Sequence, residues 1–103
     1  MKVVREEIFG PVVTAIPFRD PQEIIASANY TTYGLASAVW TKDFSTAHRV
    51  AAKLRAGTVL INCYNVFDSA LPFGGYKQSG WGREMGHEAL ELYTEIKTVC
   101  AQL

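Results

Sequence analysis

The chain of 103 residues has few cysteines, no excess of either charge and no long apolar run. Its two cysteines, Cys63 and Cys100, are too few for a disulfide framework or a structural zinc site. Ten basic residues balance ten acidic ones, which argues against a nucleic-acid partner. Arg5, Arg19 and Lys42 keep every apolar stretch below the roughly 18–20 residues that cross a bilayer. We therefore expect no bound metal, nucleic acid or membrane.

The amino-terminal residues do not resemble a signal peptide. Lys2 and Arg5 are followed by two glutamates where a signal peptide would need an apolar stretch. Hydrophobic residues make up 49% of the chain and charged residues 19%, a balance that favours one packed unit over disorder. There is no repeat or low-complexity tract. We expect a single cytoplasmic unit.

Strand and helix signals alternate along the first part of the chain. The predicted order is strand 12–16, a helix from 20, strand 35–41, a helix from 43 and strand 58–63. Asp20 can cap the first helix, Pro21 suits its first turn, and Asp43 opens the second helix. This alternation predicts an α/β fold and favours a parallel sheet.

The second part of the chain is less regular. Residues 64–82 read as a long loop rich in glycine, proline and aromatic residues, and loops of that length tend to be functional. Residues 83–93 regain a helical period, and residues 97–103 alternate as a last strand. That strand has no hairpin partner in the sequence. It must therefore pair with another subunit or with a further part of the chain.

Composition and spacing alone show no catalytic constellation. His48 and His87 fall on predicted helices and are expected to face solvent. Residues 80–86 (G-W-G-R-E-M-G) nearly spell the dinucleotide fingerprint, but methionine replaces the last glycine and a loop precedes it instead of a strand. A free-standing nucleotide binder is therefore a poor hypothesis.

Five sequence blocks point to one family. They read R-E-E-I-F-G-P-V (5–12), Y-G-L-A (33–36), G-T-V-L-I-N (57–62), P-F-G-G-Y-K-Q-S-G (72–80), and G-R-E (82–84) with Y-T-E (93–95). In this order they resemble the NAD(P)-dependent aldehyde dehydrogenase superfamily, general or phenylacetaldehyde-type, over essentially the whole chain. The resemblance implies that residues 1–96 are the carboxy-terminal part of the α/β catalytic domain. Residues 97–103 would be an oligomerisation strand.

The resemblance implies two cofactor-binding residues. Glu7 matches a glutamate that binds the ribose, a task suited to a carboxylate because it accepts hydrogen bonds from two neighbouring hydroxyls. Phe9 matches an aromatic residue that packs near the nicotinamide ring. The alternatives are an exposed acid and an ordinary core phenylalanine. The expected cofactor is NAD, with NADP left open because the discriminating residues lie mostly upstream.

Further matches concern the aldehyde. Phe67 and Phe73 match aromatics that line the family's substrate tunnel, with ordinary packing as the alternative. Glu84 matches a glutamate proposed to relay protons, and a plain acid at a helix start is nearly as good an interpretation. Gly74 and Gly75 are expected to serve backbone geometry, through positive φ or close approach. The aromatic loop suggests an aliphatic or aryl aldehyde.

The resemblance places the family's nucleophilic cysteine, general base, oxyanion-hole asparagine and cofactor domain upstream of the matched region. Cys63 lies in a different motif, so we interpret it, like Cys100, as a small buried hydrophobic residue. We therefore predict a piece of a homo-oligomeric oxidoreductase that oxidises an aldehyde to a carboxylic acid through a cysteine thioester. The piece would be inactive alone. The alternative is a non-catalytic truncated product that associates with full-length subunits.

Overall fold

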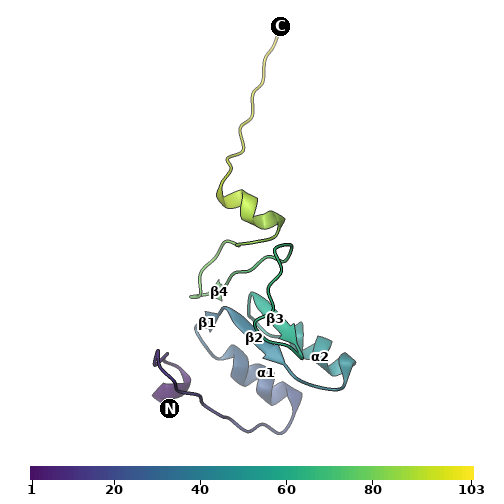
Figure 1. The fold of residues 1–103 in the computed structure, drawn as a ribbon. Helices are drawn as coiled ribbons and strands as arrows, with labels where there is room; N and C mark the ends of the chain where they lie inside the picture. Colours follow the sequence, from purple (N-terminus) through teal and green to yellow (C-terminus); the bar gives the residue numbers. More distant parts are fainter.

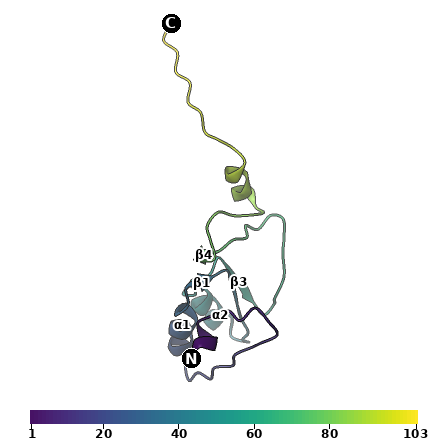
Figure 2. The same ribbon diagram turned by 90° about the vertical axis from the view of Figure 1, so that its left-hand side faces the viewer.

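The computed structural model describes all 103 residues, Met1–Leu103. Its elements are η1 (Lys2–Val4), α1 (Pro21–Asn29), β1 (Tyr33–Gly34), β2 (Ala36–Val39), α2 (Phe44–Ala51), β3 (Thr58–Ile61), β4 (Tyr76–Lys77) and η2 (His87–Leu92), where η marks a 3-10 helix. The two views in Figure 1 and Figure 2 show a small packed unit from which η2 and an extended tail lead away. The radius of gyration is 18.1 Å, against about 13 Å for a compact domain of this length. The shape is therefore open.

The packed unit is a β2–α2–β3 crossover. β2 and β3 pair in parallel, from Ala36 opposite Thr58 to Val39 opposite Ile61. Two side chains of α2, Ala47 and Val50, form the buried apolar core against these strands. The predicted α/β fold and parallel sheet are confirmed.

Both α-helices begin at the aspartates that the sequence indicates. Asp20 accepts hydrogen bonds from the backbone N–H groups of Gln22 (2.8 Å) and Glu23 (3.0 Å), and Pro21 opens α1. Asp43 caps α2, where the hydroxyl of Thr46 and nearby backbone N–H groups donate to its carboxylate and hold its pKa below the ordinary value. Such caps satisfy donors that the first helical turn leaves unpaired.

Two asparagines join distant parts of the backbone. The Asn29 side chain, at the end of α1, donates to the carbonyl oxygen of Lys53 and accepts from the N–H of Arg55, both at 2.8 Å. The Asn62 side chain accepts from the N–H of Thr41 at 2.8 Å and donates to its carbonyl oxygen at 2.9 Å. Each amide therefore replaces a pair of backbone hydrogen bonds where the strands and helices end.

A second, antiparallel ladder joins β1 to β4, with Tyr33 opposite Lys77 and Gly34 opposite Tyr76. The sequence predicted only loop over β4, because a strand of two residues has no readable alternation. Close backbone contacts accompany this ladder: a Cβ at Gly57 would overlap the carbonyl group of Gly74. The predicted close approach at Gly74 is confirmed.

Positive φ angles do not occur where they were suggested. Among the glycines they lie at Gly80, Gly82 and Gly86, and neither Gly74 nor Gly75 has one. A Cβ at Gly75 would come within 2.6 Å of Ser79, so this glycine also serves close approach. Both positions therefore need glycine for lack of space, since a methyl group would displace backbone atoms.

Two predicted elements differ from the structure, and a third needs a partner outside this chain. Residues 12–16 are extended but unpaired, so the strand predicted there is not formed. Residues 97–103 form an extended tail, and the strand predicted there stays a prediction because its partner would lie in another subunit or a further part of the chain. The helix predicted over residues 83–93 is reduced to the 3-10 turn of η2.

The two cysteines differ in how far they are buried. Cys63 is half-buried, so the prediction of a buried residue holds only in part, whereas Cys100 is exposed because the tail around it touches nothing. The prediction of a buried Cys100 is therefore wrong. No helix combines the length and the hydropathy needed to cross a membrane.

The close backbone contact between Gly57 and Gly74 gives a prediction for stability. Gly57→Ala is expected to lower the free energy of unfolding by at least about 3 kcal/mol, because its methyl group has no room. Gly10→Ala is the matched control, since nothing lies within 4 Å of a Cβ there, and should change it by less than about 0.5 kcal/mol. Urea unfolding followed by tryptophan fluorescence measures the free energy of unfolding of both variants. Equal effects of the two substitutions would contradict the close contact at Gly57.

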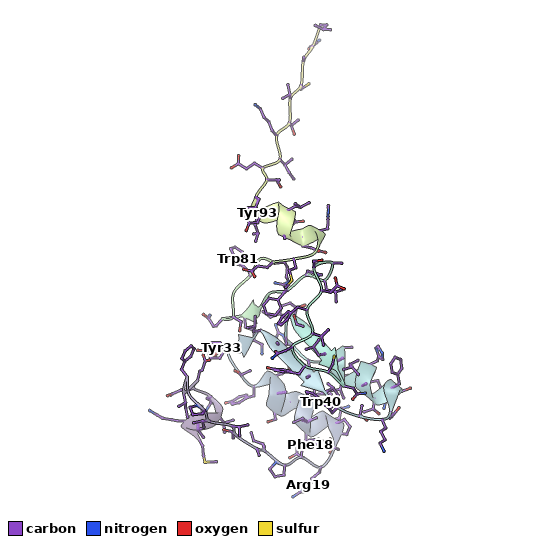
Figure 3. All side chains as sticks on the ribbon, in the orientation of Figure 1. Phe18, Arg19, Tyr33, Trp40, Trp81 and Tyr93 are labelled. Carbon is purple, nitrogen blue, oxygen red and sulfur yellow. The ribbon has the colours of Figure 1, made fainter.

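The open shape predicts self-association. Large apolar side chains are exposed along the whole chain, including Trp81, which is 97% exposed, and several residues of the tail. Figure 3 shows Trp81 and Tyr93 above the packed unit, away from Trp40 and Phe18. We expect the isolated chain to sediment as associated species in analytical ultracentrifugation, because exposed apolar surface drives association. A stable monomer with cooperative unfolding would contradict this.

Candidate functional site

Glu7 and Phe9 line a hollow in the amino-terminal segment. The hollow has a volume of about 530 Å³ and is bounded mainly by residues 3–14, in the extended stretch around η1. The Glu7 carboxylate is exposed, and the Phe9 ring is 92% exposed. Neither side chain is committed to packing in this structure, so the interpretation of Phe9 as a core residue is wrong here. Both are available to a ligand.

The backbone of Phe9 is strained. Its φ is +55°, a left-handed conformation that costs a residue with a side chain on the order of 1–3 kcal/mol. Gly10 and Pro11 follow directly, so a turn carries the ring outward. Residues in such conformations cluster at functional sites, where the strain aims a side chain.

Phe67 and Phe73 lie together in the aromatic loop. Their ring centroids are 5.5 Å apart and their planes meet at 75°, the edge-to-face arrangement that aromatic pairs prefer. Phe73 is half-buried, whereas Phe67 is 59% exposed. The structure thus brings the two predicted substrate residues into contact and leaves one apolar face open.

Glu84 lies beside Phe73 through its backbone. The N–H of Phe73 donates to the carbonyl oxygen of Glu84 at 2.7 Å, and the reverse bond measures 2.8 Å. The Glu84 side chain itself is exposed. The predicted relay residue is therefore next to the predicted substrate wall, while its carboxylate has no partner within the chain that would orient it.

The two groups of predicted residues lie apart. In both Figure 1 and Figure 2 the amino-terminal segment lies at the lower end of the packed unit, whereas the loop after β3 lies above the strands. No three His, Cys, Asp or Glu side chains gather as a metal site would require. His48 and His87 are exposed, as predicted.

Two cationic side chains hold the aromatic loop, and motif reasoning gave neither a role. The Lys77 ammonium donates to the carbonyl oxygens of Asn29 and Thr31. Arg83 Nη1 donates to the carbonyl oxygens of Gly75 (3.1 Å) and Gly82 (2.6 Å), and its guanidinium lies 5.4 Å from the centre of the Tyr76 ring. The only available signal was a cation in a glycine-rich loop, because such a loop offers unpaired carbonyl groups.

The comparison with known families decides the identity of this arrangement. The model of the Aldehyde dehydrogenase family matches residues 1–99. The chain belongs to the aldehyde dehydrogenase family.

Relatives and solved structures of other aldehyde dehydrogenases agree with this match. The chain is 58% identical to an aldehyde dehydrogenase from Bacillus cereus solved in complex with NAD+, with a TM-score of 0.92 over 96% of this chain and 20% of that one. An indole-3-acetaldehyde dehydrogenase in complex with NAD+ is 48% identical, with a TM-score of 0.93 over 100% of this chain and 21% of that one. The 4-trimethylaminobutyraldehyde dehydrogenase of Oryzias latipes is 55% identical over 99% of this chain and 20% of its own length.

The chain thus spans about a fifth of the length of the aldehyde dehydrogenases that it matches. The resemblance found in the sequence is confirmed. The open shape, the exposed apolar side chains and the unpaired tail agree with this share, because about four fifths of the length of those relatives has no counterpart here.

Stability measurements can separate ligand-facing residues from packing residues. Phe9→Gly is expected to change the free energy of unfolding by less than about 1 kcal/mol, since relief of the strained φ offsets the greater freedom of glycine. Phe73→Ala should lower it by about 2 kcal/mol, because that ring is half-buried against Phe67. A larger loss for Phe9→Gly in urea titration would make Phe9 a packing residue.

Proposed function

We propose that this chain is the carboxy-terminal segment of an NAD-dependent aldehyde dehydrogenase that oxidises an aldehyde to a carboxylic acid. The match of residues 1–99 to the family, at a fifth of the length of its relatives, carries the proposal. NAD is supported by the solved relatives in complex with NAD+, and NADP stays open. In the reaction a cysteine thiolate attacks the aldehyde, hydride passes to the nicotinamide, and water hydrolyses the thioester.

The chain alone would supply walls and contacts but no nucleophile. Cys63 is half-buried at the end of β3 and lies outside the family's nucleophile motif. The covalent steps need a thiolate and a base held in one geometry. We therefore expect residues 1–103 by themselves to be inactive.

On the cofactor side we assign Glu7 and Phe9. The exposed Glu7 carboxylate can accept hydrogen bonds from the two ribose hydroxyls. The Phe9 ring, turned outward by its positive φ, can form a flat wall against the nicotinamide. Their common hollow of about 530 Å³ supports this assignment.

On the aldehyde side we assign Phe67 and Phe73, with Glu84 as a proton relay. Two rings in edge-to-face contact make a rigid apolar wall, which suits an aliphatic or aryl aldehyde. The relatives named for indole-3-acetaldehyde and 4-trimethylaminobutyraldehyde act on substrates that aromatic walls can accommodate, by stacking or by cation–π contact. The position of Glu84 beside Phe73 supports the relay.

A second function, association without catalysis, is favoured by the tail. Residues 97–103 are extended, unpaired and exposed, with Val99 and Leu103 among the exposed apolar side chains. An unpaired extended segment can add to the edge of another sheet. We propose that these residues form the oligomerisation strand of a cytoplasmic homo-oligomer. A truncated product could join full-length subunits by the same strand.

Steady-state kinetics tests the cofactor assignment. In the full-length polypeptide that contains this segment, Glu7→Gln is expected to raise the KM for NAD about tenfold, because a charged acceptor is lost. Glu91→Gln, the same change at an exposed glutamate outside the hollow, should leave it unchanged. Residues 1–103 alone should reduce no NAD with any aldehyde. Aldehyde-dependent NAD reduction by the isolated chain, lost in Cys63→Ala, would overturn the proposal.

A further inference from the structure

Lys77 is a half-buried lysine whose side chain crosses from β4 to the end of α1. Its ammonium Nζ donates to the carbonyl oxygen of Asn29 at 3.1 Å and to that of Thr31 at 3.0 Å. Asn29 is the last residue of α1 and Thr31 lies two residues after it, where the helix leaves carbonyl groups unpaired and partial negative charge gathers. The ammonium therefore closes the helix and ties β4 to it.

The backbone at Lys77 is held on several sides. Its φ is +55°, which a residue with a side chain keeps only when its surroundings impose it. Next to it, the N–H of Gln78 donates to the carbonyl oxygen of Thr32 at 3.0 Å, and Ser79 Oγ accepts from the N–H of Gly34 at 2.9 Å. The register of β4 on β1 is thus fixed by hydrogen bonds around Lys77 and by its side chain.

The position of β4 sets the position of the aromatic wall. Only Gly74 and Gly75 separate Phe73 from β4, and Gly74 lies against the backbone of Gly57 without room for a side chain. Arg83 bonds to the carbonyl oxygen of Gly75 and precedes the residue that bridges to Phe73. A shift of β4 along β1 would therefore move Phe73 away from its contact with Phe67.

We propose that Lys77 is a positioning residue for the aldehyde side of the site. It clamps β4 to the end of α1 and so keeps Phe73 edge-on to Phe67. The inference rests on the proposed function, since it assigns a consequence for aldehyde binding. Glu7 lines an open hollow with Thr31 and Ser79, but neither Phe73 nor the two glycines that join it to β4 line that hollow, so the cofactor side should respond less.

The test uses the purified full-length enzyme and the variants Lys77→Asn, Lys77→Arg and Lys42→Asn. Asparagine tolerates a positive φ but is too short to reach the two carbonyl groups, whereas arginine keeps a long cationic donor. Lys42 is exposed and provides the same change away from the clamp. KM and kcat for aldehyde and for NAD are measured, together with hydrogen exchange of residues 73–80.

Lys77→Asn is expected to raise the KM for the aldehyde about tenfold, because both charge-assisted contacts of the ammonium are lost, and the KM for NAD less than about twofold. Lys77→Arg should restore part of the aldehyde KM, and Lys42→Asn should change nothing. Faster exchange over residues 73–80 should accompany the loss. Unchanged constants, or an equal rise of both KM values with a lowered Tm, would overturn the proposal. An inactive wild-type enzyme would instead overturn the proposed function, and exchange would still decide whether Lys77 holds β4.

Discussion

The backbones at Gly57 and Gly74 come so close that a Cβ at Gly57 would overlap the carbonyl group of Gly74. β3 begins at the residue after Gly57, and β4 begins two residues after Gly74. Together with the hydrogen bond from the N–H of Gly57 to the carbonyl oxygen of Gly34 in β1 (3.0 Å), this contact fixes the parallel β2–β3 pair relative to the antiparallel β1–β4 pair. The Arg83 side chain also lies against Gly74, and its hydrogen bond to the carbonyl oxygen of Gly75 holds the residues beside Phe73 in place.

Local signals in the sequence were enough to predict the packed unit. The caps at Asp20 and Asp43 and the helical spacing of Ala47 and Val50 act within a few residues, so they can be read without the fold. The strand predicted at 12–16 does not form, because pairing depends on a neighbour elsewhere, and the strand predicted at 97–103 needs a partner outside this chain. The two-residue ladder between β1 and β4 could not be predicted for the same reason.

For the candidate site, too, the sequence indicated some residues, and only the structure showed others. Motif matches identified Phe67 and Phe73, and the structure places their rings in edge-to-face contact. The motifs did not indicate the strained φ of Phe9 or the reach of Lys77 to the end of α1. Both are three-dimensional properties: the first depends on how a turn is closed, and the second on which carbonyl groups a distant helix leaves unpaired.

Most of the side chains to which a role is assigned here are exposed and available for contacts outside this chain. Aromatic rings, an outward carboxylate and an unpaired tail extend from a small βαβ unit with only two buried apolar side chains. The most direct test is a crystal structure of the full-length polypeptide with NAD+ bound. The account predicts the Glu7 carboxylate within about 3 Å of a ribose hydroxyl, and Phe73 still edge-on to Phe67. A ribose held by other residues, with Glu7 directed into solvent, would contradict it.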